Sequence, residues 1–238
     1  MTTVAIVPAL NEEAAIGEVV RSLTGSVDRV IVVDNGSTDG TPSVAEAAGA
    51  DVVRQSERGY GAAMLAGVAA APDADVYVFL DGDGSDEGER AAELIARLQQ
   101  ADLVLGVRAG DVEAGSMFWH QRAGNIFMSW LIRRLSGEAI HDLPSFKAIR
   151  GDVLRSLELQ ERRHGWTAEL ITRAACRDLR IVEVQTGYRR RVGVSKVSGS
   201  FKGSALAASR MNAAIVRVWW EELRSRRSAV EVPAQPLP

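Results

Sequence analysis

The stretch Val76-Tyr77-Val78-Phe79-Leu80-Asp81-Gly82-Asp83-Gly84-Ser85-Asp86 fixes the fold class of this chain. It opens with apolar β-branched and aromatic residues, which predict a strand buried on both faces. It then changes to aspartates separated by small residues. Ligands of open α/β sheets bind outside the carboxyl ends of the strands, so these carboxylates are expected to face a cleft. Their oxygen atoms suit Mg²⁺ or Mn²⁺ better than Zn²⁺, although Asp-Gly sequences also form ordinary turns.

Further strands and helices alternate on both sides of this stretch. Apolar runs predict strands at Thr3–Ala9, Asp28–Val33, Asp51–Val53 and Leu103–Gly106. Helical periodicity or helix-forming composition predicts helices at Glu13–Ser22, Thr41–Ala48, Gly59–Ala71 and Glu87–Gln100. The alternation predicts an α/β fold with a Rossmann-like, mostly parallel central sheet and helices on both faces.

Several functional classes are disfavoured by composition and by missing motifs. The 238 residues carry a net charge of −3, which gives no general nucleic-acid footprint. Neither GxGxxG after the first strand nor GxxxxGK[ST] is present. Cys176 is the single cysteine and is expected to be a small core residue in a reducing compartment. Without a signal peptide or a membrane-length apolar run, we expect a cytoplasmic protein that at most contacts a membrane surface.

The second half of the sequence is less regular. We expect a helix with mixed aromatic and basic residues at Val112–Ser136, a loop and strand at Asp142–Arg150, a helix at Trp166–Cys176, a strand at Arg180–Val184 and a basic loop at Tyr188–Lys196. The aromatic residues of the first helix either pack in the core or line a site for a hydrophobic acceptor.

The C-terminal segment predicts an amphipathic helix at Ser204–Arg227. Docking on the domain or a homodimer seam explains its tryptophans and arginines better than a membrane surface does. Ser228–Pro238 is expected to be a disordered tail. The expected organisation is one domain over residues 1–203, with a nucleotide-binding half at 1–110 and an acceptor half at 111–203, followed by this helix.

Three segments resemble family 2 glycosyltransferases of the GT-A fold: Val7-Pro8-Ala9-Leu10-Asn11-Glu12, Val33-Asp34-Asn35-Gly36-Ser37-Thr38-Asp39 and Asp81-Gly82-Asp83. Later segments are similar to the branch of dolichyl- or polyprenyl-phosphate sugar synthases: Gly106-Val107-Arg108, Asp142-Leu143-Pro144-Ser145-Phe146-Lys147, and Tyr188-Arg189-Arg190 through Ser195-Lys196. The resemblance covers about Thr3 to Ser204.

The resemblance implies roles for individual residues. The donor would be a nucleotide-diphosphate-sugar. Pro8 and Ala9 would lie along its base, Glu12 near the ribose, and Asp34 at the base or ribose. Arg58, Gly59 and Gly61 would form a wall beside the nucleotide, and the turn at Gly82 would also contact the donor. Asp81 would touch the ribose or sugar, and Asp83, with Asp81, would hold Mg²⁺ or Mn²⁺ on the diphosphate. Arg190 and Lys196 would close over the diphosphate, and Asp142 would be the base near the acceptor.

The residue types agree with this chemistry. A diphosphate leaving group gains negative charge in the transition state, which a divalent cation, Arg and Lys stabilise. The predicted acceptor is a polyprenyl phosphate or a small hydroxylated molecule. A phosphate acceptor needs no strong base, and Asp142 would then position other groups. Two alternatives stay open: a nucleotide-sugar isomerase or mutase that uses the same site without an acceptor, and a non-catalytic nucleotide-sugar binder.

Overall fold

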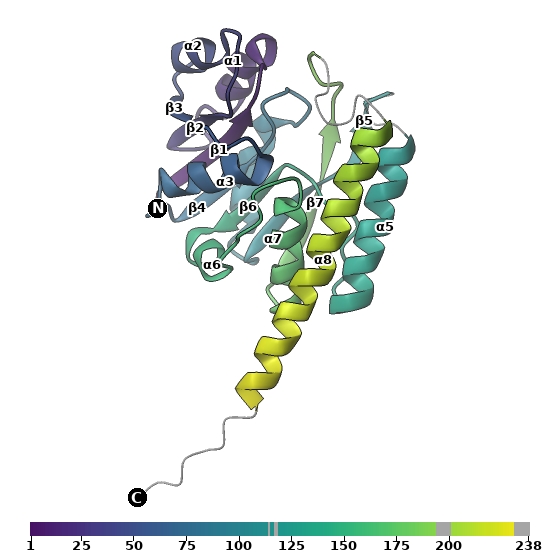
Figure 1. Cartoon of the computed structure of the whole chain (residues 1–238). Coiled ribbons are helices and arrows are strands. Elements are labelled where there is room, and N and C mark those ends of the chain that lie inside the picture. The colour runs from purple at the N-terminus through teal and green to yellow at the C-terminus, as the bar shows by residue number, and fades with distance from the viewer. Residues whose placement is uncertain (114, 117–118, 194–200, 231–238) are drawn as a thin grey trace, which may run out of the picture.

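One mixed sheet forms the centre of the molecule (Figure 1). This computed structural model describes residues 1–113, 115–116, 119–193 and 201–230. Over these residues the strands are β1 (Thr3–Ala9), β2 (Arg29–Asp34), β3 (Asp51–Arg54), β4 (Val76–Phe79), β5 (Leu103–Val112), β6 (Lys147–Arg150) and β7 (Ile181–Tyr188). Their order is β3-β2-β1-β4-β6-β5-β7, and only β6 is antiparallel to its neighbours. The predicted mostly parallel sheet is therefore confirmed.

Helices cover both faces of the sheet. One layer contains α1 (Glu13–Ser22), α2 (Thr41–Ala47) and α4 (Ala91–Arg97). The other contains α3 (Tyr60–Ala69), α5 (Trp119–Ser136), α6 (Gly151–Ser156), α7 (Trp166–Cys176) and α8 (Phe201–Val230). Successive residues of β1 point into opposite layers, since Ile6 packs with Met64 and Trp166 while Val7 packs with Ile16. A strand buried on both faces must be apolar throughout, which is why its sequence shows no alternation.

The structure differs from the predicted elements beyond Gly106. Strands β5 and β7 are longer than expected, because they pair with each other in parallel as far as Val112 and Tyr188. Their extensions mix polar and apolar residues, so the continuous apolar run ends before the backbone pairing does. Helix α5 consequently begins at Trp119 and not near Val112. The expected helix at Glu87–Gln100 is a short 3₁₀ turn at Gly88–Arg90 followed by α4, and α6 was not predicted.

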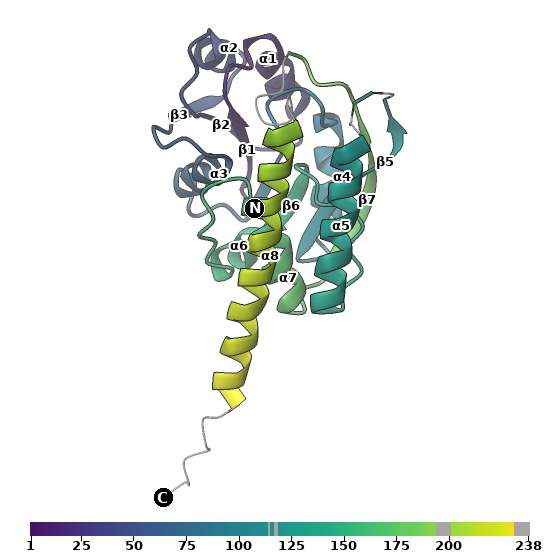
Figure 2. The same cartoon turned by 45° about the vertical axis from the view of Figure 1, so that its right-hand side comes forward.

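The long helix α8 lies against α5 and α7, and its C-terminal end extends past the body of the protein (Figures 1 and 2). Ile215 and Val218 are fully buried, and Trp219 Nε1 donates a hydrogen bond of 3.1 Å to the carbonyl of Leu135 at the end of α5. Helix α8 therefore docks on the domain, as expected. Helix α8 is longer than the expected Ser204–Arg227 and includes residues 228–230, which were expected to belong to a disordered tail. Residues 231–238 of that tail lie outside the described residues. No helix in the described part of the chain combines the length and apolar character needed to cross a membrane.

Candidate active site

A cavity of about 630 Å³ lies at the carboxyl ends of the central strands. Its walls come from the segments after β1, β2 and β4, from β5 and β7, and from helices α5 and α8. Of the residues predicted from the sequence, those that line it are Pro8, Ala9, Glu12, Arg58, Gly59, Asp81, Gly82 and Asp83. The parallel strands bring these residues together although they are far apart in the chain.

Asp81 lines the cavity and is partly buried. Burial, with the nearby charges of Asp83 and Asp86, raises the pKa of Asp81 to about 7. Within the described residues, Asp81 Oδ1 is buried and accepts no hydrogen bond. A buried carboxylate oxygen without a donor is costly unless a ligand or cation approaches it.

Asp83 lines the cavity, and both of its carboxylate oxygens have partners within the protein. Its Oδ1 accepts hydrogen bonds from the backbone nitrogen and the hydroxyl of Ser85, at 3.0 and 2.5 Å. Its Oδ2 lies 3.3 Å from Arg191 Nη1, and Arg191 Nη2 lies 3.1 Å from Glu12 Oε1. Arg191 thus connects two predicted donor-site carboxylates.

A fully buried lysine lies behind these aspartates. Lys147 Nζ donates to the carbonyl of Ser145 at 2.7 Å and lies 5.7 Å from the ring centre of Trp166. Burial lowers the pKa of Lys147 to about 8, while the charges of Asp81 and Asp86 oppose that shift. A cation at this depth offsets part of the cost of burying the carboxylates.

Asp142 is held in a bidentate pair with Arg108. Arg108 Nε and Nη2 donate to its two oxygens at 2.9 and 2.5 Å, and Asn125 Nδ2 donates to Oδ1 at 2.6 Å. Burial acts to raise the pKa of Asp142, but the hydrogen bonds and charge of Arg108 lower it below the ordinary value. Asp142 is not part of the cavity lining, whereas Arg108 and Asn125 are.

Three further predicted residues, Asp34, Gly61 and Arg190, lie outside the cavity lining. Asp34 is buried at the end of β2, and its Oδ1 accepts a hydrogen bond of 2.9 Å from the backbone nitrogen of Ser37. Gly61 packs under the backbone of Glu161. Arg190 lines a separate hollow of about 220 Å³. Lys196 lies outside the described residues.

Sequence reasoning gave no role to several residues of the cavity. These are Asn35, Tyr60, Arg108, Arg191, His120, Asn125, Arg163, His164 and Arg210. Arg108 had a usable signal, because it follows a predicted strand in Gly106-Val107-Arg108. Arg191 lies in the basic loop predicted at Tyr188–Lys196, but the run of three arginines does not indicate which of them lines the cavity.

Comparisons with known proteins identify this arrangement. A family model described as glycosyl transferase family 2 matches residues 4–157. The chain belongs to this family. An uncharacterised glycosyltransferase of Mycobacterium tuberculosis is 40% identical over 204 residues, covering 85% of this chain and 92% of the relative. The family, the enzyme class and the resemblance to polyprenyl-phosphate sugar synthases were all predicted, and all are confirmed.

Two further relatives of this glycosyltransferase carry specific names. A dolichyl-phosphate hexose transferase of Haloferax volcanii is 36% identical, with 89% of this chain and 91% of the relative covered. An undecaprenyl-phosphate mannosyltransferase of Micrococcus luteus is 31% identical, with 95% and 99% covered. Among solved structures, glucosyl-3-phosphoglycerate synthase from Mycobacterium tuberculosis with Mn²⁺, UDP and product matches with a TM-score of 0.72 at 24% identity, covering 91% of this chain and 79% of that one. That likeness confirms the GT-A fold.

Proposed function

We propose that this glycosyltransferase moves a sugar from a nucleotide-diphosphate-sugar to a polyprenyl phosphate. The observation that carries the choice of acceptor is the pairing of Asp142 with Arg108. A carboxylate that is bound by an arginine and has a lowered pKa is a weak base. A phosphate acceptor brings an ionised oxygen nucleophile and needs no base, unlike a hydroxylated acceptor.

Arg108 is the group proposed to meet the acceptor. Its guanidinium lines the cavity, is oriented by Asp142, and lies 5.3 Å from the ring centre of Tyr188. An arginine fixed in this way is suited to bind phosphate oxygens. The names of the dolichyl-phosphate and undecaprenyl-phosphate relatives support the same class of acceptor.

The donor diphosphate is proposed to bind beside Asp83 and Arg191, which form an ion pair of 3.3 Å at the cavity. No group of three or more His, Cys, Asp or Glu side chains is placed to hold a metal in the described part of the chain. Mg²⁺ and Mn²⁺ sites often use one or two carboxylates and complete their shell with substrate phosphates. The unpartnered Asp81 Oδ1 supports such a site, and Asp83 Oδ2, which pairs with Arg191 at 3.3 Å, is proposed as its second carboxylate oxygen. When bound, the cation would neutralise charge on the leaving diphosphate.

The proposed reaction is a single displacement. An oxygen of the acceptor phosphate forms a bond to the anomeric carbon, and the bond from that carbon to the diphosphate oxygen breaks. The electron pair leaves with the nucleoside diphosphate, beside Arg191. Attack opposite the leaving group would invert the configuration at the anomeric carbon.

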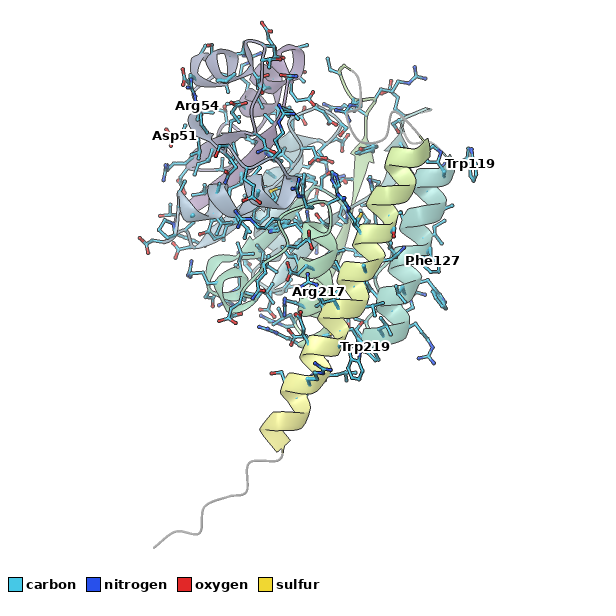
Figure 3. The ribbon with its side chains drawn as sticks, in the orientation of Figure 1. Asp51, Arg54, Trp119, Phe127, Arg217 and Trp219 are labelled. Atoms are coloured by element: carbon cyan, nitrogen blue, oxygen red, sulfur yellow. The ribbon has the colours of Figure 1, made fainter. Side chains whose placement is uncertain are left out.

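The test combines a panel of nucleotide-sugars with a short-chain polyprenyl phosphate, in Mn²⁺, in Mg²⁺ or in a chelator, and detects glycolipid by mass spectrometry. We expect one donor to give sugar-phosphate lipid only with a metal. Asp83→Asn should lower turnover by at least about 100-fold. Asp51→Asn is the matched control, because Asp51 is exposed on the outer strand β3 and pairs with Arg29 (Figure 3).

Three results would contradict the proposal. Transfer to hydroxylated acceptors and not to the lipid phosphate would disprove the acceptor class. Conversion of the donor alone into an isomeric nucleotide-sugar would favour the isomerase. Full activity of Asp83→Asn would disprove the metal role.

A further inference from the structure

Glu169 is a fully buried carboxylate that the proposed reaction does not use. It lies in the first turn of α7, and a carboxylate buried there is costly unless it is paired and hydrogen-bonded. Its Oε1 accepts hydrogen bonds from Arg173 Nε and Nη2, at 3.2 and 3.1 Å. Its Oε2 accepts hydrogen bonds from the backbone nitrogens of Gln160 and Glu161, at 3.0 and 2.6 Å. One oxygen is therefore bound by its own helix and the other by the preceding loop.

This loop, residues 160–163, fixes the start of α3, and we call it the support loop. The carbonyls of Arg163 and Arg162 accept hydrogen bonds of 3.0 and 2.9 Å from the backbone nitrogens of Gly61 and Ala62. The first N–H groups of a helix have no partner within the helix, and a bound phosphate can supply one. Here the support loop supplies the partners, so the position of α3 depends on the position of the loop.

The support loop also contacts the wall predicted beside the donor nucleotide, of which Arg58 and Gly59 line the cavity. A Cβ atom at Gly59 would lie 2.2 Å from the carbonyl oxygen of Arg162. Arg163 Nη1 donates a hydrogen bond of 2.9 Å to the carbonyl of Arg58. Arg162 Nη2 lies 2.5 Å from Glu57 Oε2. Because the contact is this close, a displaced support loop would displace the wall as well.

We propose that Glu169 is a positioning residue for the donor nucleotide, and that it acts by fixing the support loop against the wall of Arg58 and Gly59. The inference rests on the proposed donor site. The other side of the wall is held by Asn35, whose Nδ2 donates to the carbonyl of Glu57 at 2.7 Å and whose Oδ1 accepts from the Gly59 backbone nitrogen at 2.8 Å. A wall held from both sides is formed before the nucleotide binds, which lowers the entropy cost of binding.

The alternative is a purely structural role for Glu169 as a counter-ion of Arg173. Helix α7 contacts both α3 and α8 (Figure 1), and Arg173 lies 2.7 Å from Glu221 and 2.9 Å from Glu222 of α8. Arg173 therefore has two other carboxylate partners, whereas the two backbone N–H groups of the support loop depend on Glu169. A counter-ion alone would contribute to stability and would leave the nucleotide affinity of the folded protein unchanged.

The test is calorimetric titration of the full chain with UDP, GDP, ADP, CDP and dTDP in Mn²⁺, repeated on variants with the nucleotide that binds most tightly. Glu169→Gln should weaken binding about 10-fold, because its amide replaces one acceptor oxygen by a donor. Gly61→Ala should weaken binding about as much, because the added Cβ would lie 2.1 Å from the carbonyl oxygen of Glu161 in the support loop. Gly61 does not line the cavity. The double variant should also lose about 10-fold, and not about 100-fold, because both substitutions act through one loop.

Arg177→Met is the matched control. Arg177 pairs with Glu222 of α8 at 2.8 Å and donates to the carbonyl of Ser156 in α6, so its loss should lower the melting temperature and leave the nucleotide affinity unchanged. All titrations are made at a temperature at which thermal melts show each variant folded.

A lower melting temperature with unchanged nucleotide affinity in Glu169→Gln would overturn the proposal, and so would an equal loss of affinity in Arg177→Met. If Glu169→Gln does not fold, unchanged affinity in Gly61→Ala would overturn it. Absence of nucleotide binding to the wild type would instead disprove the proposed donor site, and the inference with it.

Discussion

At the scale of single residues, the site is organised around carboxylates that are buried next to a lysine. Asp86 Oδ2 accepts hydrogen bonds from the Asp81 backbone nitrogen at 3.1 Å and from the Ser145 hydroxyl at 2.8 Å. Asp86 therefore has hydrogen-bond partners within the protein, whereas Asp81 Oδ1 accepts no hydrogen bond from any described residue. Such an arrangement costs stability in the empty protein and leaves one oxygen for a ligand.

Asp81→Asn is expected to stabilise the metal-free protein above neutral pH and to abolish transfer. The folded pKa of Asp81 is raised from 3.8 to about 7, so the folded state binds this proton more tightly than the unfolded chain does. Ionisation therefore costs folding free energy above pH 7, on the order of 1–4 kcal/mol, and the cost is absent below the unfolded pKa.

Melting temperatures in chelator at about pH 8 and about pH 4 measure this effect. The asparagine variant should melt higher than the wild type at the upper pH and equally at the lower pH. Asp51→Asn, on the protein surface, should change neither value. A variant that melts lower than the wild type at the upper pH would show that the ionised carboxylate is stabilised by its surroundings.

At the scale of elements, α7 and α8 are joined by buried ion pairs. Arg173 lies 3.1 Å from Glu169 and 2.9 Å from Glu222, and all three side chains are less than a tenth exposed. Arg177 adds a contact of 2.8 Å to Glu222. Helix α8 contributes Met211 and Arg210 to the cavity, so these ion pairs help to place one of its walls.

Arg173→Met is expected to lower the free energy of unfolding by about 3 kcal/mol, because it leaves buried glutamates without their main cation. Arg217→Met is the control. Arg217 pairs with Glu221 at 3.2 Å on the surface of α8, and its loss should cost less than about 1 kcal/mol (Figure 3). Urea denaturation measures the free energy of unfolding of both variants. Equal effects of the two substitutions would show that burial does not govern the strength of these pairs.

Gly61, at the start of α3, packs closely against the backbone of the loop at residues 161–163. Its backbone nitrogen donates to the carbonyl of Arg163 at 3.0 Å, and a Cβ atom there would lie 2.1 Å from the carbonyl oxygen of Glu161. Gly61→Ala should therefore push this loop away and cost about 1–3 kcal/mol of stability. A Cβ on Gly124 of α5 meets nothing within 4 Å. Gly124→Ala should instead raise the free energy of unfolding by about 0.5–1 kcal/mol. Thermal melts in which both variants shift the melting temperature in the same direction would contradict this difference in packing.

At the scale of the whole molecule, α8 is part of the core and of the site. Ala214, Ile215 and Val218 are buried, and burial of each large aliphatic side chain contributes about 1.5–3 kcal/mol. We expect a chain that ends at residue 203 to lose cooperative unfolding and nucleotide-dependent stabilisation. A chain that ends at residue 230 should keep both, as measured by calorimetry with and without nucleoside diphosphate. A cooperative fold in the shorter chain would show that α8 is dispensable.

The first four strands and α1 to α3 could be predicted from the sequence to within a few residues. Each strand is a short apolar run, and each is followed by polar or small residues at its carboxyl end. These patterns are local, and the parallel topology that they specify places Asp81, Asp83 and Glu12 at one edge of the sheet.

Only the tertiary structure decided how the second half completes the site. Strand β6 inserts antiparallel between β4 and β5, which places Lys147 behind Asp81. Arg108 pairs with Asp142 across 34 positions of sequence. Neither arrangement has a local signal, because each depends on side chains that meet only after the strands have paired. Arg191 lines the cavity while the neighbouring Arg190 lines the separate hollow, and this difference is set by the loop after β7, which has no periodic pattern in the sequence.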